Sequence, residues 1–146
     1  METRNQINRK RILIASAAAD GHFNPLTGIA KHLLDAGYDL RWYASKHYGQ
    51  KILKLGIPHY PYRIAKEVHA SNLDTDFPER AKIKNPFKKI NWDIINFFVA
   101  RGPEYLEDIR RIREEFPFDV MICDNAFTGS VFVKDVLGVP VFAAGI

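Results

Sequence analysis

A short apolar run followed at once by an amphipathic helix pattern is the feature that most constrains the fold of this chain. Residues 11–16 (Arg-Ile-Leu-Ile-Ala-Ser) suit a strand buried on both faces, and the apolar residues at 26, 29, 30, 33 and 34 form a helical stripe. Asn24 and Pro25 supply an N-cap and a first-turn proline, so we predict that the helix begins there. His22 is therefore expected in the loop at the carboxyl end of the first strand, where open α/β sheets bind ligands.

The same alternation of strand and helix patterns continues along the chain. Further strands are predicted at residues 40–44, 58–62, 119–123 and 139–144, and helices at 48–55, 87–116 and 127–137, with a break at Gly102-Pro103. Prolines place the 58–62 strand at a sheet edge, and the polar stretch 63–86 is too long for a simple connector. This order predicts an α/β, Rossmann-like three-layer domain with a parallel sheet in the strand order 3-2-1-4-5.

Composition narrows the class of protein. A chain of 146 residues with 47% hydrophobic and 26% charged residues is long enough for one domain with its own core. The net charge of +4 comes partly from lysines between Lys82 and Lys89, for which a solvated face is the default and an acidic acceptor or membrane surface the alternative. Aromatic-basic interleaving is missing, so no nucleic-acid partner is predicted. The single cysteine, Cys123, and the lack of a long apolar stretch predict a cytoplasmic protein without a transmembrane segment.

Two side chains follow strands that are neighbours in the predicted order. His22 follows the first strand and Asp124 the fourth, so we expect them to face each other across the crevice. A carboxylate bonded to one ring nitrogen leaves the other free to take a proton, which outlines a general base. Asp124 is also placed to cap a helix near Ala126, and the two roles are compatible. Asp20 is a weaker rival partner, and the histidines elsewhere are expected on the surface: His32, His47, His59 and His69.

Several signatures of other chemistries are missing from the sequence. The loop after the first strand has one glycine, Gly21, where a dinucleotide fingerprint needs several. A Walker loop and a zinc-spaced Cys/His cluster are absent, and Gly129-Ser130 lies inside a helix pattern and is no nucleophile elbow. No cofactor and no metal are therefore predicted, and the histidine is expected to act on a substrate hydroxyl.

Four segments together resemble a known family. They are residues 21–25 (Gly-His-Phe-Asn-Pro), 36–40 (Ala-Gly-Tyr-Asp-Leu), 118–124 (Phe-Asp-Val-Met-Ile-Cys-Asp) and 137–141 (Leu-Gly-Val-Pro-Val). In this order and spacing they resemble the N-terminal, acceptor-binding portion of GT-B glycosyltransferases, most closely the macrolide and UDP-glucosyl/glucuronosyltransferase group. Tyr38 and Phe118 depart from the residues common there, histidine and proline.

The resemblance implies a reaction and a set of roles. His22 would deprotonate a hydroxyl of a small lipophilic acceptor, which attacks the anomeric carbon of a UDP- or dTDP-sugar with inversion, while Asp124 orients His22. The nucleotide sugar would be a co-substrate bound mainly by a second domain. Phe23, Asn125 and Phe127 flank the pair and either line an acceptor pocket or pack in the core. The aromatic residues of the middle region leave the same choice open: Trp92, Phe97 and Phe98.

The length of the chain adds a further expectation. Residues 1–146 correspond to the acceptor domain alone, so we expect a truncated protein that is inactive by itself and associates with itself through a bare sheet edge. Two other hypotheses remain open. One is a non-catalytic helper of a glycosyltransferase, against which an intact His22 counts; the other is an unrelated flavodoxin-like binding domain, which needs anion donors at the first loop.

Overall fold

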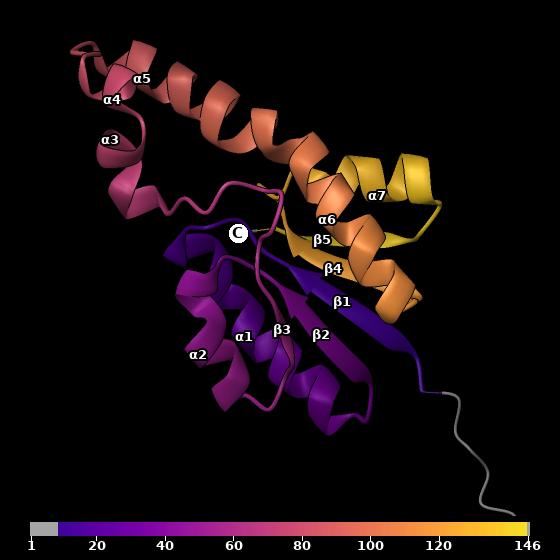
Figure 1. Cartoon of the computed structure of the whole chain (residues 1–146). Coiled ribbons are helices and arrows are strands. Elements are labelled where there is room, and N and C mark those ends of the chain that lie inside the picture. Colours follow the sequence, from indigo (N-terminus) through magenta and orange to yellow (C-terminus); the bar gives the residue numbers. More distant parts are fainter. Residues whose placement is uncertain (1–8, 146) are drawn as a thin grey trace, which may run out of the picture.

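The computed structural model describes residues 9–145, in which five parallel strands lie between two layers of helices (Figure 1). The strands are β1 (Arg11–Ala15), β2 (Asp39–Tyr43), β3 (His59–Tyr60), β4 (Val120–Asp124) and β5 (Val141–Ala144). Their order is β3-β2-β1-β4-β5 with every pairing parallel, so the predicted fold class and strand order are confirmed. A flavodoxin-like sheet has the order 2-1-3-4-5, so the sheet order also separates this chain from that hypothesis.

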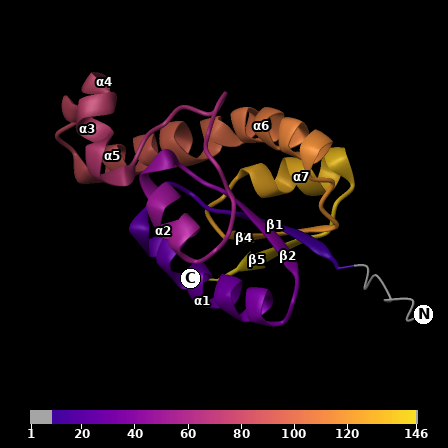
Figure 2. The same ribbon diagram turned by 60° about the horizontal axis from the view of Figure 1, so that its bottom comes forward.

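Each face of the sheet carries its own helices and its own core. The helices α1 (Asp20–Asp35) and α2 (Gly49–Lys54) cover one face, and α6 (Gly102–Glu115) and α7 (Gly129–Leu137) cover the other (Figures 1 and 2). Strand residues alternate between the two cores: Ile12 and Ile14 face α1, whereas Leu13 and Ala15 face α6 and α7. Burial on both faces explains why β1 is almost entirely apolar.

Helix α1 begins five residues before the predicted start. Its N-cap is Ala19, whose carbonyl accepts hydrogen bonds from the backbone N–H groups of His22 and Phe23, both 3.0 Å. Pro25 therefore lies inside the helix, where it costs one backbone hydrogen bond, and Asp20 in the first turn complements the helix dipole. The predicted N-cap at Asn24 is wrong, and His22 belongs to the first helical turn instead of a loop.

The middle of the chain is more helical than predicted and projects from the sheet (Figure 1). The polar stretch 63–86 contains three short helices: η2 (Ala70–Asn72), α3 (Leu73–Asp76) and α4 (Pro78–Ala81). The predicted helix 87–116 is divided into α5 (Pro86–Asp93), the π-helix η3 (Ile94–Phe98), the 3₁₀ turn η4 (Val99–Arg101) and α6. Arg80 links α4 to α5 through a two-point contact with Asp93, and it also pairs with Asp74.

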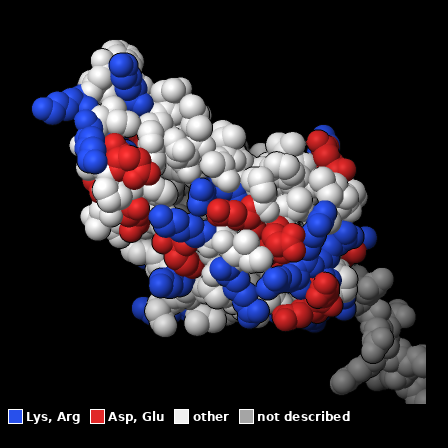
Figure 3. All heavy atoms as spheres, turned by 45° about the horizontal axis from the view of Figure 1, so that its top comes forward, with Lys and Arg blue, Asp and Glu red and all other residues white. Residues whose placement is uncertain are grey.

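The charge distribution follows this shape. Figure 3 shows basic side chains gathered at the projecting tip, while acidic and basic side chains are interspersed over the rest of that face. No helix between residues 9 and 145 combines the length and the apolar character needed to cross a membrane.

Helix α6 contains a buried carboxylate on its core-facing side, one turn after Tyr105 and one turn before Ile112. Asp108 is 3% exposed. Its carboxylate accepts hydrogen bonds from the Tyr43 hydroxyl (2.7 Å) and from the backbone N–H groups of Arg63 (3.0 Å), Ile64 (2.8 Å) and Ala65 (3.1 Å). These bonds attach the segment after β3 to α6 and start its path across the carboxyl edge of the sheet.

Candidate active site

His22 and Asp124 meet at the carboxyl edge of the sheet, as their positions after neighbouring strands predict. His22 Nδ1 lies 3.0 Å from Asp124 Oδ1, which is ion-pair distance, although the ring is turned so that the contact does not have hydrogen-bond geometry. The pairing of β1 with β4 brings the two residues together, since Asp124 ends β4 and His22 stands in the first turn after β1. Catalytic hydrogen bonds are often poorly aligned before substrate binds, so this geometry is compatible with a catalytic pair.

The Asp124 carboxylate is held from two sides. Oδ2 accepts a hydrogen bond from the backbone N–H of Ala17 (2.8 Å), and Oδ1 accepts one from the backbone N–H of Ala126 (2.8 Å). Its side chain is fully buried, and burial raises the pKa of Asp124, against the two backbone hydrogen bonds and His22, which lower it. The bond to Ala126 closes the turn that leads to α7, so the carboxylate organises this turn and faces His22 at once.

The far side of the His22 ring remains accessible. The His22 side chain keeps 26% of its surface exposed, whereas Asp124 keeps none. Phe98 approaches the imidazole edge-on with 6.0 Å between ring centres. The Thr128 hydroxyl donates a 2.7 Å hydrogen bond to the Phe98 carbonyl, so the end of the π-helix is attached to the loop that follows β4. A π-helix often marks a functional site, because the extra residue re-aims the side chains around it.

The structure separates the three residues predicted to line an acceptor pocket. Asn125 is exposed and directly follows Asp124. Phe23 is fully buried on the α1 face, where it stacks on Tyr48 with 4.0 Å between ring centres, and Phe127 is buried on the opposite face against Tyr105 at 4.7 Å. Both rings are occupied by packing, which favours the alternative that Phe23 and Phe127 belong to the core. Phe98 is the aromatic residue beside His22, and it belongs to the middle-region aromatics for which the sequence left the choice between acceptor pocket and core open.

The prediction that the remaining histidines lie on the surface is wrong for His69. His32 and His47 are exposed as expected, but His69 is only 8% exposed and lies against Tyr48. Burial lowers the pKa of His69, while a hydrogen bond from the Tyr48 hydroxyl lowers the pKa of Asp20. Asp20 points to Tyr48, so Asp124 and not Asp20 is the carboxylate that faces His22.

The same fold occurs in solved enzymes: the chain has the Rossmann-like fold of GT-B glycosyltransferases. Two solved structures illustrate the match. The calicheamicin glycosyltransferase CalG4 superposes with a TM-score of 0.72 at 16% identity, over 95% of this chain and 33% of that one. The Streptomyces sp. SF2575 glycosyltransferase SsfS6, in complex with thymidine diphosphate, has a TM-score of 0.71 at 19% identity, over 94% and 38%.

Sequence comparison identifies particular relatives. The chain is 30% identical over 134 residues to the 4'-demethylrebeccamycin synthase of Lentzea aerocolonigenes, covering 90% of this chain and 31% of that protein. It is 24% identical over 131 residues to the uncharacterized UDP-glucosyltransferase YdhE of Bacillus subtilis strain 168, covering 90% and 30%. No protein-family model matches. The predicted resemblance to GT-B glycosyltransferases is confirmed, and the chain spans about a third of the length of these relatives.

Proposed function

We propose that this chain is the acceptor-binding part of an inverting glycosyltransferase, in which His22 is the general base and Asp124 positions it. The observation that carries the proposal is the 3.0 Å approach of His22 Nδ1 to a buried carboxylate at the ligand-binding edge of the sheet. The reaction class is inferred from the resemblance to glycosyltransferases, and the roles of His22 and Asp124 are inferred from their geometry.

In this proposal the two residues divide one proton transfer between them. Asp124 holds the proton on Nδ1, so that the lone pair of Nε2 faces the acceptor hydroxyl. As the hydroxyl oxygen forms its bond to the anomeric carbon, its proton moves to Nε2 and the bond from that carbon to the nucleoside diphosphate breaks. The imidazolium that forms is stabilised by the Asp124 carboxylate, which two backbone N–H groups keep in place.

The surroundings of His22 favour an acceptor with an apolar body. Phe98 offers an aromatic edge beside the imidazole, and Asn125 offers an exposed amide next to Asp124. An aromatic aglycone stacked on Phe98 would place its hydroxyl toward His22. The nucleotide sugar is proposed to be a co-substrate held mainly by residues outside the matched region, since this region spans about a third of the length of the relatives.

The competing hypothesis of a non-catalytic helper makes a different prediction for the same residue. A non-catalytic helper does not need a base. Replacing His22 in a helper would therefore change only its stability or its binding to the partner. The pairing of a partly exposed imidazole with a fully buried carboxylate favours the catalytic role, because one ring nitrogen faces the carboxylate while part of the ring stays open to an acceptor.

Transfer activity tests the proposal. The complete polypeptide that the gene encodes is incubated with UDP- and dTDP-sugars and a panel of phenolic acceptors, and products are detected by mass spectrometry. His22→Ala is expected to lose about 10²–10⁴-fold in turnover while donor binding is retained. His32→Ala, an exposed position on the same helix, is the matched control and keeps full activity. Undiminished transfer by His22→Ala contradicts the proposal, and absence of transfer in the wild type favours the helper.

A further inference from the structure

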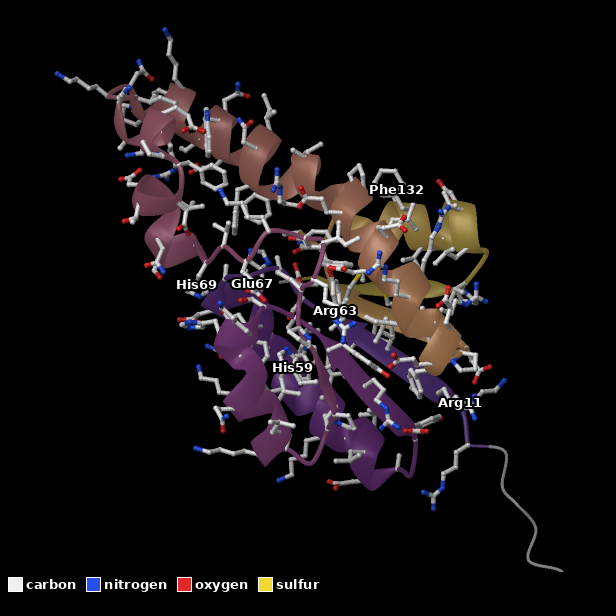
Figure 4. The ribbon with its side chains drawn as sticks, viewed as in Figure 1. Arg11, His59, Arg63, Glu67, His69 and Phe132 are labelled. Carbon is white, nitrogen blue, oxygen red and sulfur yellow. The ribbon has the colours of Figure 1, made fainter. Side chains whose placement is uncertain are left out.

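A second polar cluster lies at the same edge of the sheet and plays no part in the proton transfer described above. Asp20 comes from the first turn of α1, His47 from η1 (Lys46–Tyr48) after β2, and His69 from the segment after β3. One carboxylate oxygen and one nitrogen from each imidazole lie within 4.8 Å of one another. Figure 4 shows His69 close to Glu67 at the end of the segment that crosses the carboxyl edge.

His69 is held so that its Nε2 atom faces the cluster. Nδ1 accepts a hydrogen bond from the backbone N–H of Ser71 (3.2 Å) and lies 2.7 Å from the Ser71 hydroxyl. Nε2 lies 2.8 Å from the Tyr48 hydroxyl and 3.7 Å from Asp20 Oδ1. A metal-ligating histidine usually donates its other ring N–H to a neighbour, a role that the Ser71 hydroxyl can accept once Nδ1 carries the proton.

The other two side chains lie at the surface, where they can turn toward a shared ion. His47 stacks on His69 with 4.1 Å between ring centres and 28° between planes, and both His47 and Asp20 are exposed. A cavity of about 210 Å³ opens beside His47 and His69, which leaves room for water molecules. Glu67 at its wall is already engaged, since it accepts hydrogen bonds from the Ser45 hydroxyl and the backbone N–H of Lys46.

From this geometry we infer that Asp20, His47 and His69 bind a divalent transition-metal ion of the zinc class, with water completing the coordination. Two imidazoles and one carboxylate form a donor set that such ions favour. Ligand atoms of tetrahedral zinc lie about 3.3 Å apart, given bonds near 2.0–2.1 Å, so the 3.7 Å between His69 Nε2 and Asp20 Oδ1 needs little closure.

Binding requires two exchanges of partners. The Tyr48 hydroxyl now donates to Asp20 Oδ1 (2.9 Å) and contacts His69 Nε2. On binding, Tyr48 keeps its bond to Asp20 and gives up the one to His69. The neutral imidazole then carries its proton on Nδ1, which donates to the Ser71 hydroxyl and no longer accepts from the Ser71 N–H. The ion would then join the segments that follow β1, β2 and β3. Spacing rules miss such a site because its ligands come from three separate elements.

Metal titration of the chain itself tests the inference, independently of glycosyl transfer. The protein, without an affinity tag, is stripped with a chelator and titrated with Zn²⁺ by calorimetry, and a Co²⁺ spectrum reports the coordination geometry. We expect one Zn²⁺ per chain. His47→Ala and Asp20→Asn, both at exposed positions, should each weaken binding by about tenfold or more.

Two control variants exclude other histidines. His32→Ala and His22→Ala should each leave the affinity within about twofold, whereas a ligand substitution should cost about tenfold or more. Absence of saturable binding overturns the inference and leaves the cluster as a hydrogen-bond network. An affinity that falls with His22→Ala but not with His47→Ala also overturns it, because the ion would then sit at the His22–Asp124 pair.

Discussion

Replacement of Asp124 by asparagine should destabilise the fold by an amount that its two hydrogen bonds define. The two carboxylate oxygens accept from different backbone donors, Ala17 N–H and Ala126 N–H, both at 2.8 Å. An amide has one acceptor oxygen, so in either orientation its NH₂ group faces one of these donors. Loss of a hydrogen bond to a charged group costs about 1.5–3 kcal/mol, partly offset because a buried charge is removed. We therefore expect a loss of about 2 kcal/mol in the free energy of unfolding.

Asp119→Asn provides a matched control for this measurement. Asp119 precedes the same strand, and its Oδ2 also accepts from a backbone N–H of the β1 region, Arg11 (2.9 Å), but it is exposed. Urea denaturation, followed by circular dichroism, should show a cost below about 0.5 kcal/mol for Asp119→Asn with an unchanged m-value. An equal cost for both variants, or none for Asp124→Asn, would refute the view that burial and the two-sided hydrogen bonding hold this carboxylate.

Other predictions concern the core of the same chain. Asp108→Asn removes one acceptor oxygen from a buried carboxylate with four donors, so the free energy of unfolding should fall by about 2 kcal/mol, whereas Asp108→Ala should approach unfolding; urea denaturation checks both. Burial raises the pKa of Cys123 to about 12, so native protein should resist iodoacetamide at pH 8 and react once urea unfolds it; rapid native labelling would contradict this. Gly129→Ala should lower the melting temperature, because its Cβ would stand 2.8 Å from Tyr105 Cβ, at a cost of about 1–3 kcal/mol. Gly28→Ala, in an open part of α1, should instead stabilise by about 1 kcal/mol, and equal effects of the two variants would contradict this packing.

The strand order and the meeting of His22 with Asp124 were predictable because they rest on long-range rules with few exceptions. Parallel strands joined by helices leave few topologies, and residues that end neighbouring strands must share one edge. The start of α1 was not predictable from Asn24 and Pro25, because the Ala19 carbonyl begins the helix without a side-chain cap. Local capping rules describe preferences of about 1 kcal/mol, which tertiary packing easily exceeds.

The burial of two polar residues, Asp108 and His69, was also not predicted from the sequence. Asp108 is a charged residue on the core-facing side of α6, and its burial depends on donors from the segment after β3. His69 has no partner nearby in sequence except Ser71, and its burial depends on Tyr48. Such side chains are stabilised by groups distant in the chain, so no local periodicity reports them.

The central claim, that His22 removes the acceptor proton, is tested most directly by the dependence of transfer on acceptor acidity. Wild-type and His22→Ala forms of the complete polypeptide are compared on hydroxyl acceptors that range from acidic nitrophenols to alkyl alcohols. A base matters least when the acceptor is already ionised, so the loss caused by His22→Ala should grow from a few-fold to about 10²–10⁴-fold as acceptor acidity falls. An equal loss for every acceptor would contradict the claim and leave His22 as a residue that only positions the substrate.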